Sequence, residues 1–182
     1  MIILLVEKLA KVFRSFASEI IEILRDDDNL REIGIRGDCV YAVYTTPNKS
    51  DELEIAIKAF YINTFMRMLN KLLKDRDLPE IKVGIGQSTA QELVVKAGRK
   101  GVGINSKIWI GKAVTRACHY ADYGGKNGNP SLVFAKESYD CFIEGLALGV
   151  TNRCNVESNE PLFVGVSVRQ ENHCIFILTK PR

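Results

Sequence analysis

Apolar residues recur at helical spacing from residue 2 to residue 24, at Leu5, Leu9, Val12, Phe13, Phe16, Ile20, Ile21 and Leu24. This spacing predicts a long amphipathic helix that ends at the polar run 26–29. A second helix is predicted from a cap at Ser50 to about residue 74, because Asp51 and Glu52 fall in its first turn.

Shorter apolar and alternating runs predict strands. Residues 31–36 and 39–45 are joined by Gly37 and Asp38, and a two-residue link that begins with glycine is typical of a tight hairpin. Further strands are predicted at 81–86, 92–96, 107–110 and 131–134, helices at 111–123 and 136–144, and three strands in the remaining C-terminal residues.

The predicted order mixes helices and strands without a strict β-α-β alternation, which indicates an α+β fold with an antiparallel-rich sheet and helices on one face. The length suits one domain over residues 1–182. Gly84 and Gly86 lie inside a predicted strand, where glycine weakens pairing, so we expect another group to approach them closely.

Composition narrows the class of partner. The net charge of +3 is too small to indicate nucleic acid as a partner. The opening apolar run is interrupted at Glu7 and is too short to cross a membrane. The cysteines, 39, 118, 141, 154 and 174, form no CxxC pair and are typical of buried thiols in a reducing cytosol, so we expect a cytoplasmic protein.

Asp38 is the sharpest candidate for chemistry, since a hairpin tip lets a carboxylate project beyond a stiff sheet and hold a divalent cation that also touches phosphate. The alternative is that Asp38 is only a good turn residue.

A second candidate group lies on the helix predicted after residue 110. Thr115 and His119 are four residues apart and share one helix face, and Lys112 with the first backbone amides could meet an anion. The alternative is a core helix with polar residues outside. The basic, glycine-rich run 96–103 could cradle phosphate, but it is neither a Walker A motif nor a GxGxxG after a strand, and a mobile hairpin is the favoured interpretation.

Together these segments resemble the class III adenylate/guanylate cyclase domain. The resemblance is carried by IGIRGDCVYAVY (33–44), IKVGIG (81–86), WIGKAVTRA (109–117) and VFAKESY (133–139), in the family's order. RGDCVY (36–41), KAG (96–98), KGVGIN (100–105) and GNP (128–130) are similar to the pyrimidine-specific Pycsar cyclases of bacterial antiphage defence. Residues 146–182 match poorly.

The resemblance implies a ferredoxin-like sheet, a head-to-tail homodimer with active sites at the interface, and two divalent cations (Mn²⁺ or Mg²⁺). The ribose 3′-hydroxyl of a nucleoside triphosphate would attack the α-phosphorus and release pyrophosphate. Asp38 would be the second metal aspartate. The family's first metal aspartate lies on a strand before the helix that opens this sequence, and we expect that strand to be missing here.

Other positions depart from the family. Thr115 stands where a transition-state asparagine is usual, and His119 where an arginine meets phosphate, so Lys112 or Arg116 is the alternative source of positive charge.

On the base side, Gly34 and Ile108 occupy the positions at which purine cyclases have a lysine and an acid, which implies a pyrimidine substrate. Arg36 and Tyr41 complete the substrate-binding candidates, with Tyr44 as an alternative to Tyr41.

The leading hypothesis is a phosphorus–oxygen lyase that converts UTP or CTP to the cyclic nucleotide, which a separate effector would sense. The alternative is a catalytically inactive, cyclase-like module for nucleotide binding or dimerisation. A ferredoxin-like domain with no nucleotide remains a third hypothesis.

Overall fold

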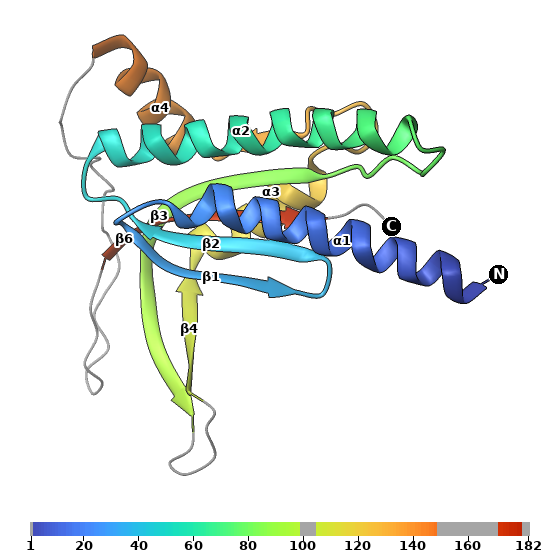
Figure 1. The fold of residues 1–182 in the computed structure, drawn as a ribbon. Coiled ribbons are helices and arrows are strands. Elements are labelled where there is room, and N and C mark those ends of the chain that lie inside the picture. The colour runs from blue at the N-terminus through green and yellow to red at the C-terminus, as the bar shows by residue number, and fades with distance from the viewer. Residues whose placement is uncertain (1, 99–104, 149–170, 180–182) are drawn as a thin grey trace.

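The computed structural model describes residues 2–98, 105–148 and 171–179 (Figure 1). Its elements, in chain order, are α1 (Ile2–Arg25), β1 (Leu30–Arg36), β2 (Cys39–Thr45), α2 (Lys49–Lys74), β3 (Gly84–Gly98), β4 (Asn105–Gly111), α3 (Lys112–Tyr123), β5 (Leu132–Phe134), α4 (Lys136–Leu148) and β6 (Glu171–Thr179).

The strands form one mixed sheet in the order β1-β2-β6-β3-β4, so the α+β character expected from the sequence is confirmed. β5 pairs in parallel with the start of β3, and the other neighbouring strands are antiparallel. β6 lies between β2 and β3 and pairs with both. It is one of the three strands predicted near the C-terminus, and residues 149–170 lie outside the described residues.

The β1–β2 hairpin matches its prediction. Arg36 pairs with Cys39, which leaves Gly37 and Asp38 as the turn. Gly37 has φ 60°, as the first position of a type II′ turn requires. Asp38 therefore stands at the tip of the hairpin.

β3 is a single strand, so the prediction of separate strands at 81–86 and 92–96 is wrong. The middle of the strand is polar but buried, which conceals it in a hydrophobicity pattern. Neighbouring helices supply the partners there: Gln87 Nε2 donates to Glu52 Oε2 of α2 at 3.3 Å, and the hydroxyl of Ser138 in α4 donates to that of Thr89 at 3.1 Å.

Helices cover both faces of the sheet, so the expectation of helices on one face is also wrong (Figure 1). Val40, Ala42 and Tyr44 of β2 face the core formed with α1 and α2. Val43, between them, packs against α3. α4 lies beside α2, where the rings of Phe60, Phe134 and Phe142 meet.

α3 lies on β3 at backbone distance, as the strand glycines predicted. A Cβ atom on Gly84 would lie 1.9 Å from the Ala121 carbonyl oxygen, and one on Gly86 would lie 2.1 Å from that of Ala117. The helix meets the strand with buried alanines spaced four apart, Ala113, Ala117 and Ala121, which share one helix face. Small residues on both sides permit this separation.

The N-cap of helix α2 lies two residues before its predicted position at Ser50. Its N-cap is Asn48, whose backbone amide donates to the Asp51 carboxylate at 2.8 Å. Asp51 lies three residues after Asn48, so it can satisfy an amide that no helical carbonyl reaches, whereas Ser50 is already helical.

Two expectations from the sequence concern the burial of the thiols and the lack of a membrane-spanning helix. Cys118 is exposed, so the expectation of buried thiols is wrong for that residue. No helix in the described part of the chain has the length and apolar character to cross a membrane.

We predict that Gly86→Ala lowers the free energy of unfolding by about 3 kcal/mol, because its Cβ would force α3 and β3 apart. Gly145→Ala is the matched control: its Cβ would be 3.5 Å from the Leu53 Cβ, an ordinary contact, and alanine favours the α4 helix by roughly 1 kcal/mol. Urea unfolding followed by circular dichroism measures both. Equal stability of the two variants would contradict the close packing.

Candidate functional site

Asp38 is exposed at the hairpin tip, where its carboxylate oxygens are the donor type that Mg²⁺ and Mn²⁺ prefer. Among the described residues, no group of three or more His, Cys, Asp or Glu side chains could hold a metal ion. Asp38 thus suits one position in a coordination shell that substrate phosphates and other ligands would complete.

Beside this tip, three of the sequence-predicted substrate residues come together. Gly34 pairs with Tyr41 across the hairpin, and a Cβ on Gly34 would lie 2.8 Å from the Tyr41 ring. The Arg36 guanidinium lies 5.6 Å from the centre of the same ring, a cation–π distance. The Tyr41 ring thus fills the space that a side chain at position 34 would need.

Glu32 fixes the outer end of Tyr41. The Tyr41 hydroxyl donates to Glu32 Oε1 at 2.7 Å, and Trp109 Nε1 donates to Glu32 Oε2 at 2.9 Å. We call Glu32, Tyr41 and Trp109 the Glu32 cluster. The pKa of Tyr41 is raised, first by burial and then by the hydrogen bond and negative charge of Glu32, with Arg36 opposing the shift.

The Glu32 cluster joins opposite ends of the sheet. Glu32 belongs to β1 and Trp109 to β4, which are the first and last strands in the sheet order. Lys107 of β4 makes a second link, donating to the Arg31 carbonyl oxygen at 2.8 Å, and its ammonium lies 5.9 Å from the Trp109 ring. β3 curves so that the β3–β4 hairpin comes round toward β1 (Figure 1).

Two base-side candidates lie apart from this cluster. Ile108 is 45% exposed and, as the neighbour of Trp109 on a strand, points to the opposite side of β4. Tyr44 is fully buried, and its hydroxyl donates to the Leu24 carbonyl oxygen at 2.5 Å. Tyr44 is therefore a core residue, and the alternative that it contacts a base is wrong.

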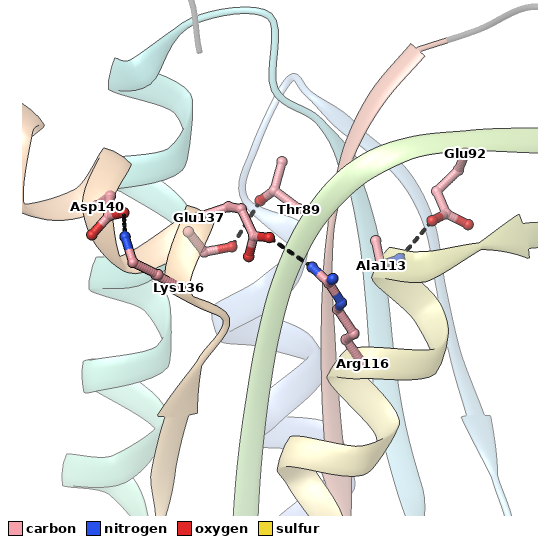
Figure 2. Close-up of polar contacts among 8 residues, drawn as sticks. Thr89, Glu92, Ala113, Arg116, Lys136, Glu137 and Asp140 are labelled. Carbon is pink, nitrogen blue, oxygen red and sulfur yellow. Dashed lines mark hydrogen bonds and ion pairs between the residues drawn. The ribbon is translucent and has the colours of Figure 1, made fainter. Parts of the chain in front are cut away.

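The start of α3 already holds an anionic group of the protein. Glu92 of β3 accepts a hydrogen bond from the Ala113 amide at 2.6 Å, and Figure 2 shows its side chain reaching this helix end. A Cβ on Gly111 would lie 2.4 Å from the Glu92 carboxylate, so glycine there gives the carboxylate its room. The expectation that the first amides of this helix meet a ligand anion is thus wrong for Ala113.

The catalytic candidates on α3 follow the i, i+3, i+4, i+7 spacing of one helix face, at Lys112, Thr115, Arg116 and His119. Thr115 donates its hydroxyl proton to the Gly111 carbonyl oxygen at 3.2 Å, and Arg116 pairs with Glu137 at the start of α4 at 2.8 Å (Figure 2). Lys112 is exposed in the first turn. His119 lines a surface pocket of about 260 Å³ with Asp122, Tyr123, Lys126, Asn127 and Asn129.

The structure thus gathers the substrate-binding candidates Gly34, Arg36 and Tyr41 on the hairpin that carries Asp38, but it does not bring them together with the α3 candidates in the contacts described. Residues 99–103, which form the last part of the basic, glycine-rich run, lie outside the described residues.

Comparison with curated proteins identifies the relationship. A uridylate cyclase of Treponema porcinum is 57% identical over 130 residues, which are 71% of this chain and 46% of that protein. The chain is a homologue of uridylate cyclases. A second uridylate cyclase, of Gulbenkiania mobilis, is 33% identical over 140 residues, 74% of this chain and 54% of the relative.

These matches confirm the resemblance to pyrimidine nucleotide cyclases, although they cover only part of each relative. The chain spans about half the length of the curated relatives it matches. No protein-family model matches the sequence, and no solved structure matches the chain.

Glu32, Lys107 and Glu92 were not singled out by the sequence reasoning. Nothing local distinguishes a charged strand residue that has a partner from one that is only solvated. Glu32 meets Trp109, 77 residues away, Lys107 meets Arg31, 76 residues away, and Glu92 meets Ala113, 21 residues away. The one available signal was that Trp109 is the only tryptophan and carries an N–H that needs an acceptor when partly buried.

The pKa of Glu92 is raised because burial disfavours its charge, although the Ala113 amide lowers it. Between the ordinary value of 4.5 and the raised value, the folded chain binds more protons than the unfolded chain, so stability rises as pH falls. We predict that Glu92→Gln flattens this rise in urea unfolding over the pH range above 4.5. Glutamine keeps an oxygen for Ala113 but does not titrate.

Glu80→Gln, a change at an exposed position, serves as the control and retains the pH dependence of the parent chain. An unchanged slope in Glu92→Gln would show that Glu92 does not titrate in this window.

Proposed function

We propose that this chain is part of the catalytic domain of a pyrimidine nucleotide cyclase. Such an enzyme is a phosphorus–oxygen lyase that converts UTP, or CTP, to the 3′,5′-cyclic monophosphate and pyrophosphate. The homology to uridylate cyclases supports the reaction class and favours UTP. The chain covers about half of those relatives, so their activity is extended here by homology.

The observation that carries the proposal is the Tyr41 ring lying over Gly34. A site that hydrogen-bonds a purine edge needs a side chain that reaches it, and buried polar partners discriminate strongly against a base that lacks the matching groups. Position 34 has no side chain, and the tyrosine occupies the space beside it. A smaller base edged by an aromatic ring fits this arrangement better than a purine does.

The phosphate side of the site would use the hairpin tip. Arg36 can neutralise phosphate oxygens with a fixed fork of N–H donors while its cation stays near Tyr41. Asp38 would hold a divalent cation, which when bound supplies charge neutralisation for the triphosphate. The stiff hairpin holds both residues at a fixed spacing, which lowers the entropic cost of orienting the substrate.

His119, Lys112, Thr115 and Arg116 remain the proposed contacts to ribose and phosphate. They lie on α3, whereas Arg36, Tyr41 and Asp38 lie on the β1–β2 hairpin. A homodimer in which α3 of one subunit faces the hairpin of its partner would combine the two sets, and we propose this arrangement. A separate effector that senses the cyclic nucleotide, with a role in antiphage defence, completes the proposal.

We predict that Asp38→Asn lowers cyclic-nucleotide formation by at least about 100-fold, because the amide is a poor ligand for a hard cation. The full-length gene product is incubated with Mn²⁺ and UTP, CTP, ATP or GTP in separate reactions, and cyclic product and pyrophosphate are measured. Asp77→Asn is the matched control: Asp77 is also an exposed turn aspartate, and asparagine tolerates its φ of 53°.

A cyclic pyrimidine product that Asp38→Asn removes and Asp77→Asn retains identifies the base and the metal residue together. No product from any nucleotide would reject the cyclase and leave the inactive nucleotide-binding module, whose nucleotide affinity is measured in the same preparation. A cyclic purine product would reject the role given to Tyr41 and Gly34.

A further inference from the structure

Glu32 occupies an unusual position for a strand carboxylate, because each of its oxygens accepts a bond from a different aromatic residue. Tyr41 donates to Oε1 at 2.7 Å and Trp109 to Oε2 at 2.9 Å. Tyr41 lies on the neighbouring strand β2, and Trp109 lies on β4 at the far end of the sheet. One side chain thus fixes two rings that the sheet order separates.

Both contacts use an accepting oxygen of the Glu32 carboxylate. An ionised carboxylate offers two accepting oxygens and no donor, and hydrogen bonds to a charged acceptor are stronger than neutral ones. The Tyr41 phenol and the Trp109 indole N–H both donate to it, so a side chain with a single accepting oxygen could not hold both in this way. If Glu32 is lost, each ring loses the hydrogen bond that it donates to a carboxylate oxygen.

Other contacts also hold the rings. Tyr41 and Trp109 both pack against the hydrophobic cluster formed by Val43 and the alanine face of α3. Arg36 contacts Tyr41 over its ring face and through a side-chain hydrogen bond, whereas Gly34 has no side chain to hold the ring. Trp109 has Lys107 near its face, and Lys107 is itself tied to the Arg31 carbonyl oxygen of β1. Among these contacts, Glu32 is the group that links the hydroxyl end of Tyr41 to Trp109 of β4.

We propose that Glu32 is a positioning residue that sets the base selectivity of the site: it holds Tyr41 over Gly34 and ties that ring, through Trp109, to the β3–β4 hairpin. This inference rests on the proposed cyclase function. Glu32 acts through the two rings and does not itself contact the reacting atoms. Loss of either bond lets the Tyr41 ring leave the space beside Gly34, which weakens pyrimidine binding and admits larger bases.

The first test does not depend on activity. Trp109 is the only tryptophan, so intrinsic tryptophan fluorescence reports this cluster alone. Glu32→Gln replaces one accepting oxygen with a donor, and we expect red-shifted emission and about twofold stronger quenching by acrylamide. Glu80→Gln, the matched change at an exposed position, leaves both unchanged.

The second test is kinetic and uses the full-length gene product. We expect Glu32→Gln to raise KM for UTP about tenfold with little change in kcat, and to reduce the ratio of kcat/KM for UTP over ATP by a similar factor. A residue that only stabilises the fold would lower the active fraction and leave KM and this ratio unchanged. Equal KM values and ratios in parent and variant would overturn the proposal.

Tyr41→Phe covers the case in which Glu32→Gln does not fold. It removes only the hydroxyl that Glu32 holds and leaves the Trp109 bond in place. The same rise in KM with unchanged tryptophan emission supports the proposal, and an unchanged KM overturns it.

If the parent forms no cyclic product, the proposed function fails separately. UTP binding is then followed by the quenching of Trp109, and an equal Kd for the parent and for either variant overturns the role of Glu32.

Discussion

Helix α3 lies against β3 at the distance of backbone contact, because Gly84 and Gly86 present no side chain to it and alanines face them from the helix. The candidate residues of α3 depend on this contact for their position. Arg116, Thr115 and His119 occupy the helix sides that the alanine face leaves exposed. Glu92, a buried residue three positions after the continuous buried segment 84–89 of β3, then reaches the start of the same helix and satisfies the Ala113 amide.

At the β1–β2 hairpin, a glycine without a side chain makes room for an aromatic ring instead of a helix backbone. Gly34 and Tyr41 are register partners, and the ring takes the space beside the glycine. Glu32 extends this contact to Trp109, which the curvature of β3 brings round from the far end of the sheet. The cluster links sheet curvature to the shape of the proposed base site, since β4 contacts β1 only if β3 bends.

Local patterns predicted the parts that local physics controls. Gly37 and Asp38 were identified as a hairpin turn because a type II′ turn needs glycine at its first position, and that position has φ 60°. The close approach to Gly84 and Gly86 was predicted because glycine inside a strand costs stability unless a neighbour requires it. The prediction split β3 into two strands because its middle is polar. The buried Gln87 and Thr89 have their partners in α2 and α4, and the pattern along one strand carries no information about those helices.

The sequence by itself determined the hairpin turn and the helical segments, because each depends on residues close together in the chain, and its motifs carried the resemblance to pyrimidine cyclases. Only the tertiary structure decided that β6 lies between β2 and β3, that α3 covers a second face, and that Glu32 meets Trp109. The physical reason is that hydrophobicity and turn preference act over a few residues, whereas a donor 77 residues away becomes a neighbour only after the sheet has assembled and curved.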